Sequence, residues 1–318
     1  MGGGEGRARR ALRTISTHVL GGRSAATVDE PAAAVTPPLE LRDLGPRGFG
    51  AEVCSLTISV AMDDAETQQL MRDAIDRHGV LCLRFGVQLD DTQLRGVVEC
   101  FGPIKDRVGR CRDGVVRPYT AASPGSRIDE QINVLDTSRG AGGGGGPGAT
   151  NWHTDDSYCE VPCGYTALHP RELPPSGGGG TQFLNMRHAY EALPPETQRQ
   201  LEGMRGVHWQ ASTTAARALF GRGTPGPDSP KSFDLTNLVD VTHPLVRTHP
   251  NTGRKALYMN LDRMMCIEGM SVEESAPLLN HLEYFAEQAG TRYVHKWEQG
   301  DVVVWDNRCS IEQHPRPQ

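Results

Sequence analysis

Residues 151–155 read Asn-Trp-His-Thr-Asp, and the interpretation of the whole chain depends on this stretch. In an extended segment, residues i and i+2 project to the same face, so the side chains of His153 and Asp155 can bind one metal ion. A facial site for non-haem iron needs one more ligand, typically a histidine from a distant strand. Because a lone His-x-Asp pattern also occurs by chance, the surrounding sequence must decide between iron ligands and coincidence.

Short elements surround this stretch and indicate a domain that mixes helices and strands. Glycine-rich loops are expected on both sides of it, at 138–150 and 176–180, and a long surface insertion is expected at 211–230. Helices are predicted at residues 63–78, 90–101, 189–204 and 271–289, and strands at residues 80–85 and 301–305. The third helix is expected to break at Pro194-Pro195, and the fourth is expected to begin with a capping box of Ser271 and Glu274.

The composition is that of an ordinary folded protein. The 318 residues are enough for one large domain or two small ones, and the formal net charge is −6. The body of the chain has no prominent Lys/Arg tract, which argues against nucleic acid as a partner. No apolar run approaches the ~20 residues that span a membrane. Eight scattered cysteines indicate reduced thiols in an intracellular compartment, and a homo-oligomer is one of the states left open.

The first 38 residues differ from the rest and are expected to form a disordered leader before a domain that covers residues 39–318. Arginines alternate there with Ala, Ser and Thr, and Glu5 is the only acidic residue before Asp29. Such a segment is typical of a transit peptide for a mitochondrion or plastid, and equally of a basic tail on a cytoplasmic protein.

Several separate motifs follow one another in a fixed order along residues 40–312. They are RHGVLCLR at 77–84, FG at 101–102, NWHTD at 151–155, GGGT at 178–181, THPLVRTHP at 242–250, GRKALY at 253–258, GD at 300–301 and WDNR at 305–308. This series resembles the taurine dioxygenase and 2,4-dichlorophenoxyacetate dioxygenase family, whose members use Fe(II) and 2-oxoglutarate. The resemblance is specific because the motifs occur together and in order, and it does not depend on any one of them.

The resemblance implies a mainly β fold with flanking helices, in the form of a double-stranded β-helix or jelly-roll barrel. It also implies that His153 and Asp155 are iron ligands and that Thr181 hydrogen-bonds the distal carboxylate of 2-oxoglutarate. The implied enzyme hydroxylates a small organic substrate with O2 and converts 2-oxoglutarate to succinate and CO2 by oxidative decarboxylation. The protein's part is to leave coordination positions open and to orient the reactants in a dry pocket.

The sequence departs from the family pattern at the third ligand. The family places its second histidine seven residues after the tryptophan of the WDNR motif, and Glu312 stands at that position here. The nearest histidine is His314, which faces the same way in an extended strand but lies about 6.6 Å further on, at ~3.3 Å per residue. Since Fe(II) also accepts oxygen donors, Glu312 is favoured by its position, His314 is the weaker alternative, and a site without either remains open.

A second departure concerns the clamp for the co-substrate. The family arginine that binds the C5 carboxylate of 2-oxoglutarate lies beyond the last histidine, whereas Arg316 comes too early and the sequence ends at Gln318. The clamp and the closing, C-terminal strands of the barrel are therefore expected to be missing. A second hypothesis follows, in which the chain is a catalytically impaired or non-catalytic paralogue that acts as a metal- or partner-binding scaffold.

Overall fold

The computed structural model describes residues 13–19, 39–105, 108–110, 116–118, 133–136, 152–173, 180–209, 240–260 and 263–314. The predicted loop at 138–150, most of the loop at 176–180, the insertion at 211–230 and Arg316 lie outside these residues. Within them, strands with short flanking helices confirm the predicted mainly β fold. None of the described helices is both long and apolar enough to span a membrane.

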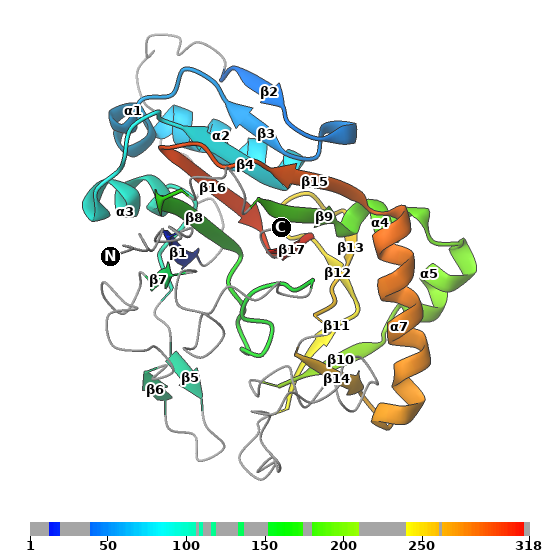
Figure 1. Ribbon diagram of the computed structural model, residues 1–318. Coiled ribbons are helices and arrows are strands. Elements are labelled where there is room, and N and C mark those ends of the chain that lie inside the picture. The colour runs from blue at the N-terminus through cyan, green and yellow to red at the C-terminus, as the bar shows by residue number, and fades with distance from the viewer. Residues whose placement is uncertain are drawn as a thin grey trace, which may run out of the picture.

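A seven-stranded sheet extends from the top of the molecule to about mid-height in Figure 1. Its strands pair antiparallel, except that β3 and β4 run parallel to each other. Across the sheet they are β2 (Leu41–Asp43), β3 (Ala51–Val53), β4 (Val80–Arg84), β16 (Asp301–Asp306), β8 (Tyr165–Glu172), β1 (Arg13–Val19) and β7 (Asn133–Asp136).

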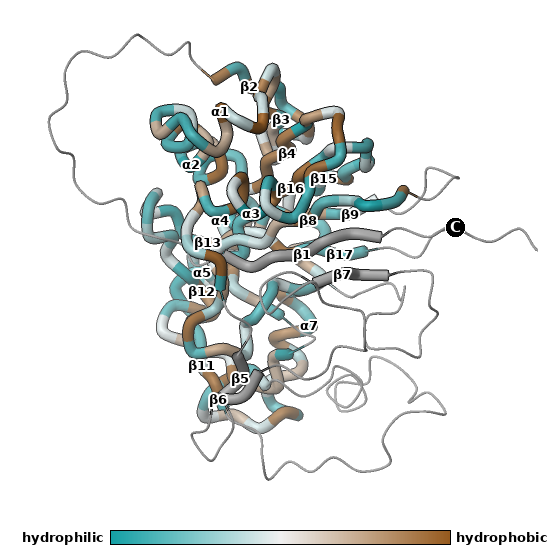
Figure 2. Tube along the Cα trace, turned by 90° about the vertical axis from the view of Figure 1, so that its left-hand side faces the viewer, coloured by the Kyte–Doolittle hydropathy of each residue, from teal (hydrophilic) through white to brown (hydrophobic). Residues whose placement is uncertain are grey.

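The central strands β4 and β16 are buried on both faces, which explains their continuous apolar sequences. Successive side chains of a strand point to opposite faces. Leu83 and Val302 therefore pack in one core cluster, whereas Cys82 and Val303 pack in another cluster that contains Trp305. Figure 2 shows the hydrophobic residues that run along β3 and β4 in this layer.

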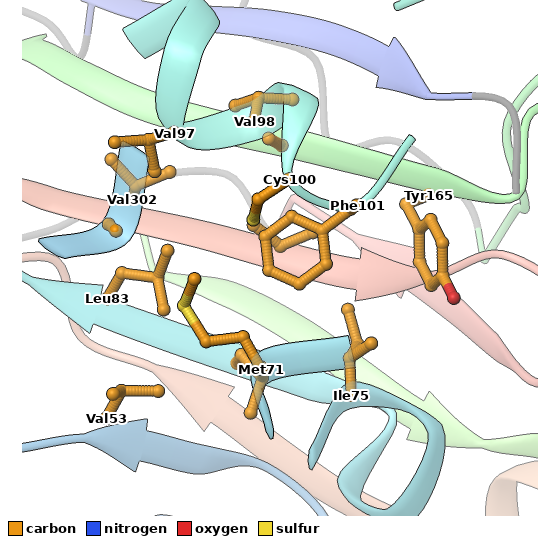
Figure 3. Packing of buried hydrophobic residues seen from close by; sticks show 14 of the residues in the cluster. Val53, Met71, Ile75, Leu83, Val97, Val98, Cys100, Phe101, Tyr165 and Val302 are labelled. Atoms are coloured by element: carbon orange, nitrogen blue, oxygen red, sulfur yellow. The ribbon is translucent and has the colours of Figure 1, made fainter. Parts of the chain in front are cut away.

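Three helices cover one face of the sheet, and the main one ends where the sequence predicts. The predicted helix at 63–78 corresponds to the helix Ala65–His78, which begins after Asp64, whose carboxylate accepts from the backbone N–H of Thr67 at 3.0 Å. Gly79 ends this helix with a φ of 74°, a conformation that glycine adopts without strain. Figure 3 shows Met71 of this helix packed against the sheet. The three helices are α1 (Ile58–Asp63), α2 (Ala65–His78) and α3 (Asp91–Glu99).

A second sheet of three strands has the order β15-β9-β17. Leu184 and Ile311 of this sheet pack in a core cluster with Ala189 and Leu282 of the neighbouring helices. The predicted break at Pro194-Pro195 and the predicted capping box are both confirmed. The elements are β9 (Thr181–Asn185), β15 (Thr291–His295), β17 (Ser310–Gln313), α4 (Met186–Ala192), α5 (Pro195–Leu201) and α7 (Val272–Ala289).

The remaining strands form smaller sheets, which lie at mid-height and below in Figure 1. They comprise the sheet of β10 (Arg205–His208), β11 (Val241–Pro244) and β14 (Met264–Ile267), the pair β12 (Val246–Thr248) and β13 (Lys255–Leu257), and the pair β5 (Val108–Arg110) and β6 (Val116–Pro118); a 3-10 turn, η1, covers Pro46–Gly48.

Strand β1 departs from the predicted organisation, because it lies inside the segment 1–38 that was expected to be a disordered leader. Its seven residues pair with β8 and β7, so the expected domain start at residue 39 is corrected for them. The sequence RTISTHV is rich in β-branched residues, which favour strands. The expected absence of closing strands stays a prediction, since residues 315–318 lie outside the described part of the chain.

Candidate metal centre

The structure joins the His-x-Asp segment to the last described strand. The backbone N–H of His153 donates to the carbonyl of Glu312 at 3.0 Å, and the N–H of Glu312 donates back to the carbonyl of His153 at 2.8 Å. These two bonds form an isolated antiparallel bridge. Because β17 is also paired with β9, the bridge fixes the His-x-Asp segment to the edge of the three-stranded sheet.

Three side chains converge at this bridge. Nε2 of His153 lies 3.7 Å from Oδ1 of Asp155 and 3.5 Å from Oε1 of Glu312. One ligand atom from each residue can be chosen so that all three lie within 4.8 Å of one another. The structure thus places both members of the predicted pair beside Glu312, the residue that the spacing favoured. His314 is not in this group of three.

Glu312 offers a direct test of whether the residues fit a cation. Its side chain is 3% exposed, and its Oε2 atom makes no hydrogen bond. Nε2 of His314 is 3.1 Å from Oε2, which is within ion-pair range but lacks the angle of a hydrogen bond. A buried carboxylate oxygen in this state costs on the order of 1–3 kcal/mol or more. A divalent metal would satisfy it, and one imidazole with two carboxylates suits Fe(II) or Mn(II).

Asp155 is held by residues that the sequence analysis did not single out for this purpose. Its Oδ2 accepts a hydrogen bond from Oγ1 of Thr166 at 2.7 Å. Nδ2 of Asn307 donates to the same Thr166 oxygen at 2.8 Å, and Oδ1 of Asn307 accepts from the backbone N–H of Asp155 at 3.2 Å. The WDNR motif pointed to Asn307, but no sequence signal pointed to Thr166.

Thr181 lies next to the cluster, as the predicted co-substrate contact. It is fully buried at the start of β9 and accepts a hydrogen bond from Nε1 of Trp297 at 3.1 Å. Nδ1 of His314 is 3.2 Å from the Thr181 hydroxyl. His314 therefore stands between Thr181 and Glu312 and connects the predicted co-substrate contact to the group of three.

The charged residues of the WDNR motif pair with each other in the protein interior. Arg308 donates to both carboxylate oxygens of Asp306, through Nε at 2.8 Å and Nη2 at 2.7 Å, and Nε2 of His249 is 2.7 Å from Oδ2. Burial alone would raise the pKa of Asp306, but the two cationic or donor partners outweigh it and hold that pKa well below its usual range. Asp306, Arg308 and His249 therefore form a buried network whose charges and donors satisfy one another.

Comparison with known proteins identifies relatives along nearly the whole described domain. The chain is 31% identical to an alpha-ketoglutarate-dependent 2,4-dichlorophenoxyacetate dioxygenase from Cupriavidus pinatubonensis (strain JMP 134 / LMG 1197), over 84% of this chain and 89% of the relative. It is 28% identical to pentalenolactone F synthase from Streptomyces avermitilis, over 83% and 84% of the two chains. Both proteins are similar to this chain at a level that leaves the substrate open.

Solved structures agree with this relationship. A crystal structure of AAD-2 in complex with Mn(II) and N-oxalylglycine superposes with a TM-score of 0.61 and 26% identity, over 88% of this chain and 92% of that chain. The family model described as taurine catabolism dioxygenase TauD, TfdA family matches residues 40–311. The sequence resemblance along residues 40–312 is thereby confirmed, and the chain belongs to the TauD/TfdA family of dioxygenases.

Proposed function

We propose that this chain is an Fe(II)- and 2-oxoglutarate-dependent dioxygenase that hydroxylates a small organic substrate with O2 and converts 2-oxoglutarate to succinate and CO2. The observation that carries the proposal is the convergence of His153, Asp155 and Glu312 on one point. Membership of the family supports it, as do relatives whose names state a dependence on alpha-ketoglutarate.

His153, Asp155 and Glu312 are the proposed iron ligands. Iron bound there would supply the one-electron chemistry that O2 activation needs. The chain itself supplies one neutral and two anionic donors, held by the bridge between the His-x-Asp segment and β17. The second carboxylate favours binding of a divalent cation, but it also repels a dianionic keto acid more than a histidine would.

Thr181 is the proposed contact for the distal carboxylate of 2-oxoglutarate. Its oxygen already accepts the indole N–H of Trp297, so the Thr181 hydroxyl proton is available for donation. In the structure that proton can be directed to Nδ1 of His314, 3.2 Å away. Binding of a carboxylate by Thr181 would therefore require His314 to turn away from the hydroxyl.

The finer architecture also belongs to this proposal. We assign the seven-stranded sheet and the sheet of β15, β9 and β17 to the two walls of a double-stranded β-helix, with the proposed ligands where the His-x-Asp segment meets β17. The match to the family and the superposition on AAD-2 support this assignment. The comparisons lend no support to the alternative of a non-catalytic scaffold.

Turnover of 2-oxoglutarate tests the proposal. The full chain is incubated with Fe(II), ascorbate, 2-oxoglutarate and O2, and succinate is measured against a His153→Ala control whose folding is checked by circular dichroism. Wild-type succinate formation clearly above that control is expected. Equal formation in two folded proteins would refute the proposal and favour the scaffold. Glu312→His provides a matched gain-of-function variant, which is expected to bind 2-oxoglutarate more tightly because one ligand charge is removed.

A further inference from the structure

We infer that Asn307, acting through Thr166, orients Asp155 so that only one of its two carboxylate oxygens faces the metal. The inference deepens the proposed function and rests on it. It assigns positioning roles to two buried residues that do not belong to the group of three proposed ligands.

The two oxygens of Asp155 have different surroundings. Oδ1 lies toward His153, 3.7 Å from its Nε2 atom, and is the oxygen on the side of the cluster. Oδ2 accepts the Thr166 hydroxyl at 2.7 Å. Thr166 is 1% exposed, so water does not readily replace its hydroxyl. Oδ2 is therefore held by Thr166, and Oδ1 is the oxygen that faces the cluster.

The direction of the hydrogen bonds follows from the chemistry of each group. A backbone N–H can only donate, so the Asn307 atom that contacts the N–H of Asp155 is the amide oxygen, and the opposite atom is the NH2 group. That NH2 donates to Oγ1 of Thr166 at 2.8 Å. The single proton of Thr166 is then free to go to the carboxylate of Asp155. Sγ of Cys163, 3.8 Å from Oγ1, is a weaker competing acceptor.

The central sheet holds this arrangement rigidly. Thr166 on β8 is paired with Trp305 on β16, and Asn307 follows that strand directly. The backbone N–H of Asn307 also donates to the carbonyl of Gly164 at 2.9 Å. The hydroxyl of Thr154 donates to the backbone carbonyl of Asn307 at 2.9 Å. The orientation of Asp155 is thus set by the two strands at the centre of the sheet.

A carboxylate held in this way occupies one coordination position where a chelating one would occupy two. The proposed reaction needs room on the metal for a keto acid and O2, so the hydroxyl of Thr166 protects a position that the co-substrates require. Partners of this kind around a metal ligand typically change metal affinity about 10- to 100-fold when they are removed.

Binding of Mn(II) to the full chain, measured from the free Mn(II) signal in electron paramagnetic resonance, tests the inference without turnover. Thr166→Val removes the hydroxyl at nearly constant shape and is expected to weaken Mn(II) binding about 10- to 100-fold. Thr166→Ser keeps the hydroxyl and should bind like the wild type. Thr291→Val is the control, because it removes a buried hydroxyl that hydrogen-bonds to His188 and lies outside the network of Thr166, Asn307 and Asp155.

The role of Asn307 is tested by a double-mutant cycle of Asn307→Asp and Thr166→Val. The added charge acts in both backgrounds, so the non-additive part reports the connection through Thr166. The Thr166 substitution is expected to cost less affinity in the Asn307→Asp background than in the wild type. If Thr166→Val does not fold, Thr166→Ala removes the same hydroxyl.

Three results would each overturn the inference while leaving the metal site intact. They are an Mn(II) affinity of Thr166→Val equal to that of the wild type, a loss of Mn(II) affinity in Thr166→Ser as large as in Thr166→Val, and additive effects of Asn307→Asp and Thr166→Val. A wild-type chain that does not bind Mn(II) would overturn the proposed function as well.

Discussion

Three clusters among the described residues contain a histidine and a carboxylate at metal-binding distances, and two of them differ clearly in what surrounds the carboxylates. In the cluster of His249, Asp306 and Cys309, Arg308 and His249 satisfy both carboxylate oxygens of Asp306. In the cluster of His153, Asp155 and Glu312, a buried carboxylate oxygen makes no hydrogen bond. Convergent donors thus indicate a metal site where a buried carboxylate oxygen lacks a hydrogen bond, and a packing network where both carboxylate oxygens are satisfied.

The largest expected effect is the loss of stability when the cluster of Asp306 is broken. Asp306→Asn leaves the buried guanidinium of Arg308 without its main counter-ion, although Asp76, 3.3 Å from Nη2, compensates in part. Removing one partner of a buried ion pair typically costs 3–5 kcal/mol, so a loss of about that size is expected in urea unfolding.

Asp155→Asn is the matched change in the other cluster. It removes a carboxylate that we propose as a metal ligand, so it should abolish Mn(II) binding but destabilise the metal-free protein much less than Asp306→Asn does. Equal losses of unfolding free energy in the two variants would contradict the distinction between the clusters.

Metal removal gives the next largest effect. A ligand that binds only the folded state stabilises it by about 2.7 kcal/mol at one hundred times its dissociation constant. Mn(II) at that ratio should raise the unfolding free energy of the wild type by this amount, and a chelator should reverse the gain. The same addition should leave Asp155→Asn unchanged, whereas stabilisation of that variant would show that Mn(II) binds elsewhere.

A buried polar atom that makes no hydrogen bond does not by itself indicate a metal site, and His208 is an example. Its side chain is fully buried, neither ring nitrogen makes a hydrogen bond, and burial lowers its pKa to about 3. In the unfolded chain the pKa of this histidine keeps its ordinary value near 6.5. Below that pH the unfolded state therefore binds a proton that the folded state does not bind. The stability contributed by neutral His208 is complete above pH ~6.5 and falls as the pH drops toward 3.

His208→Leu should therefore flatten the pH dependence of stability. At 1.36 kcal/mol per pH unit, the wild type is expected to lose about 2 kcal/mol more than the variant between pH 7 and 5. Urea unfolding at both pH values measures this difference. Mn(II) affinity should be unchanged, because His208 belongs to no group of three candidate ligands within the described part of the chain; a weaker affinity would place this residue in the metal site.

Local features of the fold could be predicted from the sequence because their causes are local. The helix end at residues 78–79 and the capping box at Ser271 are set by residues at the helix ends themselves, and the structure shows them there. Strand β1 was missed because its arginine-rich surroundings indicated a leader, while its β-branched residues favoured a strand. Its pairing with β8 depends on residues about 150 positions away, which single-segment patterns do not contain.

The metal centre likewise combines features that local sequence patterns predict with contacts between distant residues that they do not predict. The spacing of His153 and Asp155 and the position of Glu312 after the WDNR motif brought three residues to attention that the structure then places together. The contact between Thr166 and Asn307 joins residues 141 positions apart and depends on the register of β8 against β16. That register is set by packing of the central sheet, so no motif spacing could reveal it.

The smallest expected effect concerns an ion pair that is neither buried, as Asp306 and Arg308 are, nor part of a group of convergent metal-binding donors. Arg254 and Glu191 are in contact on the surface, with side chains 41% and 43% exposed. Water already solvates both charges, so pairing them gains little and removing one leaves no buried charge behind. Arg254→Gln should change the unfolding free energy by less than about 1 kcal/mol, with a smaller difference from the wild type at high salt. A loss as large as that of Asp306→Asn would mean that proximity of opposite charges, and not their burial, determines what a cluster contributes to this fold.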